Sequence, residues 1–181
     1  MAEAAVREQV EEQENPMRRL RIEKVVVNCS VGEAGARLER AVKILEMLTG
    51  QKPSIRKAKK TIKGFGIHKG EPIAAMVTLR KERAIEFLKR AFEAVRNTIK
   101  AESFDEHGNF AFGVKEHLDM PGTRYDPELG IIGFDVIVHV ARPGIRVTRR
   151  RIRRSRISRS HRPTREEVIE FFERELGVNV V

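Results

Sequence analysis

The chain has 181 residues, of which 40% are hydrophobic, so it is long enough and apolar enough for one domain with a real core. Its net charge of +10 favours a polyanionic partner, while the acidic N-terminus and the lack of a long apolar run argue against a secretion signal or a membrane-spanning helix. A single cysteine, Cys29, excludes an internal disulfide and is typical of a reduced, intracellular protein.

The N-terminal part of the chain combines a polar segment with a strand pattern. Residues 1–14 carry five glutamates and predict an acidic tail. Asn15 and Pro16 have the residue types of a helix N-cap and a first helical position, so a short helix is expected over Met17–Leu20. The β-branched run Ile22–Val31 then predicts a buried strand.

Two helix patterns and a hairpin pattern follow. A helix over residues 36–50 is indicated by apolar residues at helical spacing and by the terminal glycine. Strands are expected over Ser54–Ile62 and Ile73–Leu79, joined by a loop over Gly64–Glu71, and a second helix over Lys81–Lys100. The expected apolar faces are Leu38, Val42, Leu45 and Leu48 in the first helix, and Ile85, Leu88, Phe92, Val95 and Ile99 in the second.

The C-terminal part adds two strands and a closing helix. The strands are expected over Asn109–Val114 and Ile131–Val140. Thr164 and Glu167 have the spacing of a capping box, which predicts a helix over Glu166–Leu176.

The element order predicts an α+β fold. In this fold an antiparallel-rich mixed sheet carries helices packed on one face, in a split β-α-β-like arrangement. The expected organisation is an acidic tail over residues 1–14, an α+β domain over residues 15–140, and an Arg-rich extension with a terminal helix over residues 141–181.

Two glycine-containing motifs resemble known binding loops only in part. The sequence KGFG at Lys63–Gly66 matches the start of the RNA-recognition-motif core, but Ile67 and Gly70 stand where that motif needs aromatic rings. A basic hairpin is therefore favoured there. Gly32–Gly35 is half of a dinucleotide fingerprint and also has the GXXG spacing of the KH clamp, which approaches RNA phosphates. The acidic Glu33 would repel those phosphates, so a tight strand-to-helix turn is favoured.

No pattern in the sequence indicates catalysis. It has no nucleotide-hydrolase loop and no serine or cysteine nucleophile motif, and Cys29 has no thiol partner. His139 alternates with Ile137 and is interpreted as a satisfied strand residue. We therefore expect no enzyme activity, no cofactor and no metal site. The histidines, none with metal-ligand spacing, are His68, His107, His117, His139 and His161.

The strongest signal is an arginine-rich segment. Between Asp135 and Glu166 lie eleven arginines, no lysine and no acidic residue, so the other 25 basic residues nearly balance the 26 acidic ones. Forked guanidinium groups suit bidentate phosphate contacts, and the segment is expected to stay disordered or extended until it meets RNA. The arginines assigned to RNA are Arg142, Arg146, Arg149, Arg150, Arg151, Arg153, Arg154, Arg156, Arg159 and Arg162.

Several blocks of the sequence resemble the large-subunit ribosomal protein L-five family, which is called L-eleven in eukaryotes. The blocks are Lys24–Gly35, Leu48–Arg80, Phe112–His117 and Gly130–Val138, and the resemblance runs from about Asn15 to Val140. The tail resembles the archaeal and eukaryotic branch, which implies an archaeal source.

The resemblance implies a non-enzymatic, cytoplasmic ribosomal protein that anchors 5S rRNA in the central protuberance. It also implies contacts with large-subunit rRNA, P-site tRNA, an L-eighteen-type neighbour and a protein of the small-subunit head, and no membrane. By resemblance, the 5S rRNA-binding residues are Arg18, Arg19, Arg21, Asn28, Arg56, Lys57, Lys59, Lys60 and Lys63. The loop that would reach tRNA comprises Gly64, Phe65, Gly66, Ile67, His68, Lys69 and Gly70.

Two alternatives stay open at this point. Phe65 either anchors the base of the hairpin or stacks on a nucleotide. The runner-up function is a single-stranded RNA-binding module of the RNA-recognition-motif type, which would need aromatic rings on the face of the sheet.

Overall fold

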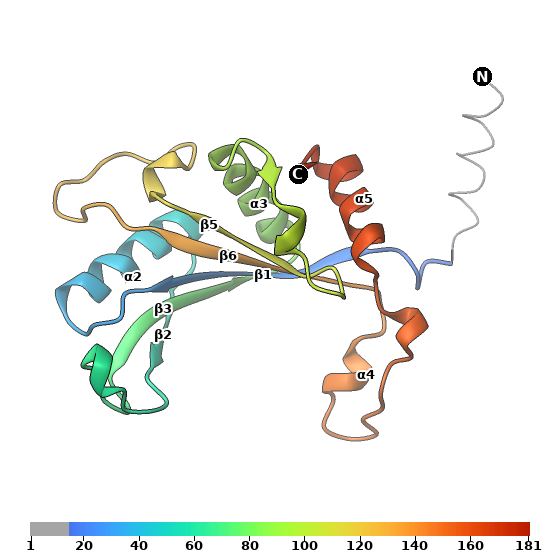
Figure 1. Ribbon diagram of the computed structural model, residues 1–181, viewed down its shortest axis with the longest axis horizontal. Helices are drawn as coiled ribbons and strands as arrows, with labels where there is room; N and C mark the ends of the chain where they lie inside the picture. Colours follow the sequence, from blue (N-terminus) through green and yellow to red (C-terminus); the bar gives the residue numbers. More distant parts are fainter. Residues whose placement is uncertain (1–14) are drawn as a thin grey trace.

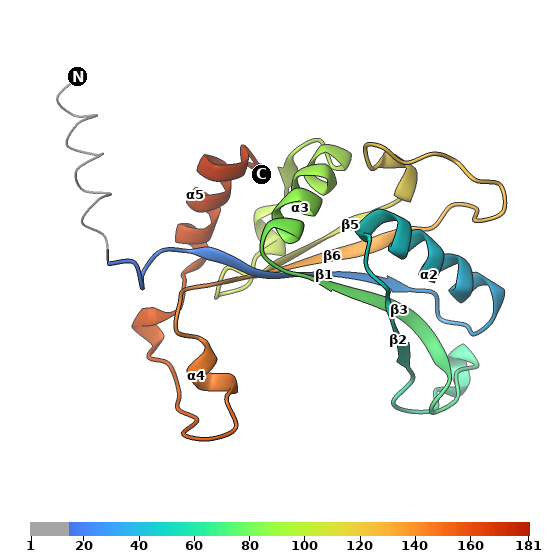
Figure 2. The same ribbon diagram turned by 180° about the vertical axis from the view of Figure 1, so that it is seen from behind.

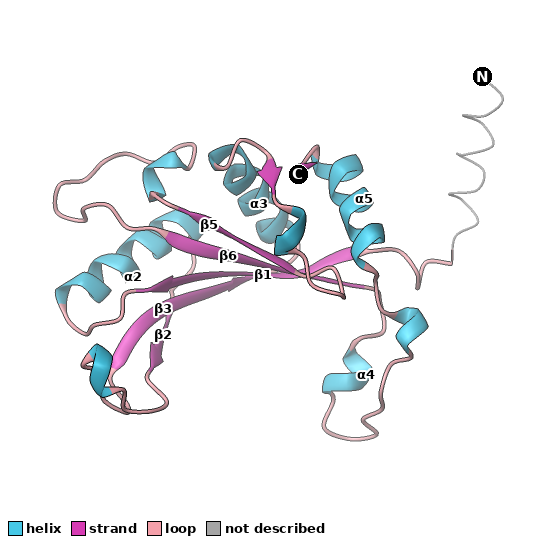
Figure 3. Cartoon of the chain, in the orientation of Figure 1, coloured by secondary structure: helices cyan, strands magenta, loops and turns pink. Residues whose placement is uncertain are grey.

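The computed structural model describes residues 15–181, so the predicted acidic tail over residues 1–14 lies outside the described residues. Helices and strands are interspersed along the chain (Figures 1 and 3). In chain order they are β1 (Arg21–Ser30), α2 (Ala36–Thr49), β2 (Ser54–Lys57), β3 (Pro72–Leu79), α3 (Glu82–Ala94), β4 (Thr98–Ile99), β5 (Phe110–Val114), β6 (Phe134–Ala141), α4 (Arg146–Arg149), α5 (Arg165–Leu176) and β7 (Asn179–Val180).

The main sheet has five strands in the order β2-β3-β1-β6-β5, and every neighbouring pair is antiparallel. Helices α2, α3 and α5 lie on one side of it, whereas α4 and the β2–β3 loop project to the other side (Figures 1 and 2). Parallel pairing occurs in the separate β4–β7 ribbon. The structure therefore confirms the predicted α+β class with its helix-covered sheet.

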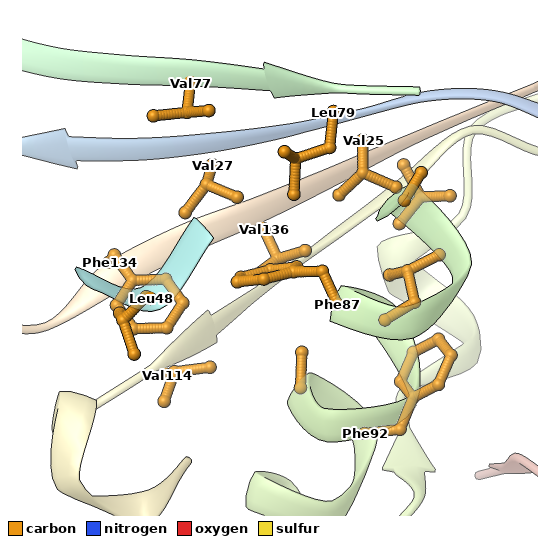
Figure 4. Packing of buried hydrophobic residues seen from close by; sticks show 14 of the residues in the cluster. Val25, Val27, Leu48, Val77, Leu79, Phe87, Phe92, Val114, Phe134 and Val136 are labelled. Carbon is orange, nitrogen blue, oxygen red and sulfur yellow. The ribbon is translucent and has the colours of Figure 1, made fainter. Parts of the chain in front are cut away.

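The core lies between the sheet and the helices because side chains alternate along each strand. Val25 and Val27 of β1 are fully buried, and Val27 pairs with Val77 of β3 and with Val136 of β6 on the same face. Phe87 of α3 packs over this layer (Figure 4).

Aromatic rings join the closing helix to the rest of the core. Phe172 of α5 makes edge-to-face contacts with Phe110 of β5 at 4.9 Å and with Phe92 of α3 at 6.1 Å between ring centroids. The predicted capping box is also present, because Thr164 Oγ1 accepts from the amide of Glu167 and Glu167 Oε2 accepts from the amide of Thr164. Helix α5 is thus fixed at its start and along its apolar face.

Helix α3 is shorter than predicted. It ends at Ala94 because Arg96 and Asn97 adopt positive φ values of 56° and 52°, and the Asn97 amide bonds back to the carbonyl of Phe92. Ile99 is buried in β4, which pairs with β7 near the C-terminus. The predicted apolar face is confirmed for Leu88 and Phe92, which are buried, whereas Ile85 is exposed and the buried Phe87 was not predicted.

The limits of three other predicted elements also differ from those in the structure. The helix expected over Met17–Leu20 is wrong, because the Asn15 side chain and carbonyl accept the amides of Met17 and Arg18 and close a turn instead. Strand β2 ends at Lys57, where its register with β3 shifts. Strand β6 begins at Phe134, three residues later than expected.

Candidate nucleic-acid interface

In the described part of the chain, the side of the sheet opposite α2 and α3 carries no helix layer, and we call it the open face (Figure 2). Asn28 lies near its centre, paired with Met76 of β3 on one side and with Asp135 of β6 on the other. Arg56 of β2 pairs with Ala74 of the same face. By strand register, the polar side chains of the open face are Lys24, Asn28, Ser30, Ser54, Arg56, Thr78, Asp135 and His139.

Residues 57–71, the hairpin arm, project beyond the open face at the β2–β3 end (Figure 1). The arm is held by paired backbone bonds between Ile62 and Ile67 at 2.9 and 3.2 Å, and by a bond from the Lys69 amide to Thr61 Oγ1 at 3.0 Å. Its lysines are exposed. The arm is therefore a folded basic projection.

The tip of the hairpin arm contains the KGFG sequence. Lys63–Phe65 form a 3₁₀ turn that Gly66 ends with a positive φ of 66°. Phe65 is 77% exposed, so the expectation that it anchors the base of the hairpin is wrong. Its ring is free to stack on another molecule.

Residues 142–163, the extension, project from the opposite end of the sheet and include α4 (Figure 1). The expectation of a disordered or extended segment is wrong, because the extension is a loop held to the body. Arg162 donates to His107 Nε2 at 3.1 Å, and His161 donates to the Pro143 carbonyl at 2.9 Å. The side chain of Arg142 is 10% exposed and donates to Glu167 Oε1 at 2.7 Å. Arg142 therefore supports the loop from inside.

A histidine connects the extension to the open face. His139 accepts a bond from Arg149 of α4 at Nε2, at 3.1 Å, and donates from Nδ1 to Asn109 Oδ1 at 2.5 Å. This pattern requires a neutral ring. Burial lowers the pKa of His139, and the positive charges of Lys24 and Arg149 lower it further, against the opposing effect of nearby carboxylates. The sequence prediction of a satisfied strand histidine is confirmed.

The structure separates the residues assigned to 5S rRNA into three groups and one single residue, Arg21, which begins β1. Asn28 and Arg56 share the open face, and four lysines lie on the hairpin arm. Arg18 and Arg19 lie at the other end of the molecule, where they line a groove of about 950 Å³ together with acidic residues of α5. The lysines on the arm are Lys57, Lys59, Lys60 and Lys63.

Sequence reasoning missed several residues of the open face. Lys24 could have been found, because it alternates with Val25 and Val27 along β1. Arg80 comes beside them only through the antiparallel pairing of β1 with β3. Asp135 is brought beside Asn28 by β6, and its carboxylate would repel a phosphate at this part of the face.

The described residues were compared with the requirements of a metal site, a membrane-spanning helix and a reactive thiol. Within residues 15–181, no group of His, Cys, Asp and Glu side chains could hold a metal ion, and no helix is long and apolar enough to cross a membrane. Cys29 is buried and its Sγ lies 3.4 Å from the Gly133 carbonyl oxygen. Burial raises the pKa of the thiol, which disfavours the reactive thiolate.

Comparison with known proteins identifies two family regions. The model described as ribosomal protein L5 matches residues 15–68, and the model described as the C-terminus of the same ribosomal family matches residues 72–171. The large ribosomal subunit protein uL5 of Aeropyrum pernix is 56% identical over 92% of this chain and 88% of its own length. The proteins of the same name from Pyrobaculum aerophilum and Archaeoglobus fulgidus are 55% and 51% identical over 92% of this chain, and each is covered over 93% of its length.

The lowered pKa of His139 predicts a pH-dependent stability. In the pH range below the unfolded-state pKa of about 6.5, the unfolded chain binds more protons than the folded one. The contribution of His139 to the free energy of unfolding is therefore full above that pH and is lost as the pH falls through the lowered folded pKa. Urea unfolding of the wild type and of His139→Gln between pH 7.5 and 5 should show a steeper loss in the wild type. Parallel profiles would contradict this assignment.

Proposed function

The chain belongs to the ribosomal protein L5 family, and on this premise we propose that it is a structural protein of the large ribosomal subunit that binds 5S rRNA and anchors it in the central protuberance. The relatives found are ribosomal proteins, and the chain is not an enzyme. The proposed place of action is the cytoplasmic ribosome.

The observation that carries this proposal is a sheet face without a helix layer, bounded by two basic projections. The hairpin arm stands at one end of the open face and the extension at the other (Figure 1). Both carry exposed cations, and Arg56 lies on the face between them. A folded RNA laid on this face would have its phosphates contacted from both ends, which fixes its position without reading its sequence.

The centre of the open face has a different chemistry. The Asn28 side chain donates to Ser30 Oγ at 3.0 Å, which holds its amide in one orientation and leaves the carbonyl oxygen for a partner. Asp135 next to it accepts hydrogen bonds and repels phosphate. The pair suits base edges or ribose hydroxyls of non-helical RNA, so it would supply specificity while the surrounding cations supply affinity.

We assign the remaining contacts by family and by position. The tip of the hairpin arm, Gly64 to Gly70, is proposed to reach the P-site tRNA, with the exposed ring of Phe65 stacking on a nucleotide. Another surface is proposed to bridge to the small-subunit head, with an L-eighteen-type protein as neighbour in the protuberance. In the extension, the proposed contacts with rRNA are made by its exposed arginines, which include Arg146, Arg151, Arg153, Arg154, Arg156 and Arg159.

The alternative of an RNA-recognition-motif module is not supported by the structure. Within the described residues, eight of the nine phenylalanines belong to the core or pack against it, and the ninth, Phe65, lies at the tip of the arm. The open face thus presents valine, methionine and polar side chains instead of stacked rings. A module of that type needs two or three bases stacked on strand aromatics.

Binding to 5S rRNA tests the proposed function. At a fixed, physiological salt concentration, excess tRNA and unrelated duplex RNA should not displace 5S rRNA from the protein. If the projections neutralise six to ten phosphates, the affinity should fall by about 10³–10⁵ between 50 and 200 mM salt. Equal competition by every RNA would contradict a shape-specific open face and leave only non-specific attraction by the basic projections.

The role of Phe65 is tested by removing its ring. Phe65→Ala should weaken binding of the hairpin arm to tRNA in assembled subunits by about 1–3 kcal/mol, because stacking is lost, while 5S rRNA binding stays unchanged. Phe65→Leu serves as a control that keeps apolar bulk without an aromatic face. Unchanged tRNA binding in Phe65→Ala would remove the stacking role.

A further inference from the structure

One carboxylate on the open side of the sheet is surrounded by arginines. Glu23 lies where the register between β1 and β6 shifts, and its side chain is 17% exposed. Its Oε2 lies 3.3 Å from Arg21, and its Oε1 lies 3.1 Å from Arg149 and 3.6 Å from Arg80. Arg80 also donates to the backbone carbonyl of Glu23 at 3.3 Å.

These arginines come from three separate parts of the chain. Arg21 begins β1, Arg80 follows β3, and Arg149 ends α4 in the extension, 126 residues from Glu23. Three guanidinium groups at such short distances repel one another. A largely shielded carboxylate between them offsets this repulsion more effectively than solvent does, because screening is weaker at a partly buried site.

We propose that Glu23 is a positioning residue for RNA binding, which holds Arg21, Arg80 and Arg149 beside the open face and docks the extension there. Each guanidinium has five N–H donors and uses only some of them on Glu23. The three side chains are 43–53% exposed, so the remaining donors can meet phosphates. This inference rests on the proposed function, in which the open face binds RNA.

The direction in which RNA affinity changes when the carboxylate is removed distinguishes a positioning role from simple repulsion of RNA. A carboxylate that merely lies within a phosphate-binding surface repels RNA, so its removal should strengthen binding. A carboxylate that fixes three cations in one arrangement should weaken binding when it is removed, although the net charge becomes more positive. The two readings therefore predict opposite changes for the same substitution.

The decisive variant is Glu23→Gln, and its matched control is Glu86→Gln on the exposed side of α3 in the helix layer. Both substitutions raise the net charge by one. We expect Glu23→Gln to bind 5S rRNA about ten-fold more weakly than the wild type at physiological salt, because groups in one salt-bridge network have coupling energies of this order. Glu86→Gln should bind as the wild type does. Equal or tighter binding by Glu23→Gln would overturn the proposal.

A charge-conserving variant tests whether the position of the carboxylate matters in addition to its charge. Glu23→Asp keeps the negative charge but shortens its reach by one methylene, so it should also weaken RNA binding while its thermal unfolding stays close to that of the wild type. Wild-type affinity in Glu23→Asp would show that charge alone matters and would overturn the positioning role.

A readout without RNA distinguishes failure of this inference from failure of the proposed function. Trypsin cuts after arginine, and residues 150–154 of the extension are exposed. In the free protein, Glu23→Gln should be cut in the extension several-fold faster than the wild type and Glu86→Gln, because the docking contact to Arg149 is lost. Unchanged cleavage would overturn the docking role, whether or not the wild type binds 5S rRNA.

Discussion

The alternation of side chains along β1 is the constraint on which the rest of the structure depends. Val25 and Val27 face the helices, while Lys24 and Asn28 face away from them, so one strand serves the core and the proposed binding surface at once. A slip of one residue in the pairing would put lysine into the core and valine onto the proposed RNA-binding surface. The fixed register of the central strand therefore protects both stability and function.

The extension is held in place by carboxylates that belong to the folded body. The extension has no acidic residue of its own, and the carboxylates that hold it, Glu23 and Glu167, belong to β1 and α5. Arg142 is largely buried by this attachment, whereas Arg149 and other arginines of the extension stay exposed for the proposed phosphate contacts. A segment that could not pack a core by itself thus gains a defined position from contacts with the folded body.

Local patterns in the sequence predicted most helices and strands. They could not predict contacts between residues that are far apart in the sequence. The capping box at Thr164 and the helix stop at Gly50 depend on neighbours within a few residues, and both are present. The end of α3 was missed because apolar spacing continues to Ile99, which is buried instead through pairing with β7. The docking of the extension was missed because the contact between Glu23 and Arg149 spans 126 residues, which no local pattern reveals.

The central claim is that RNA lies on the open face and not on the helix layer, and differential acetylation of lysines in the complex with 5S rRNA tests it most directly. We expect strong protection of Lys24 and of Lys57 and Lys60 on the hairpin arm, because phosphates and bases would cover them. Lys43 of α2 and Lys89 of α3 are exposed on the helix layer and should react as in the free protein. Protection of Lys43 and Lys89 with full reactivity of the arm would contradict the account.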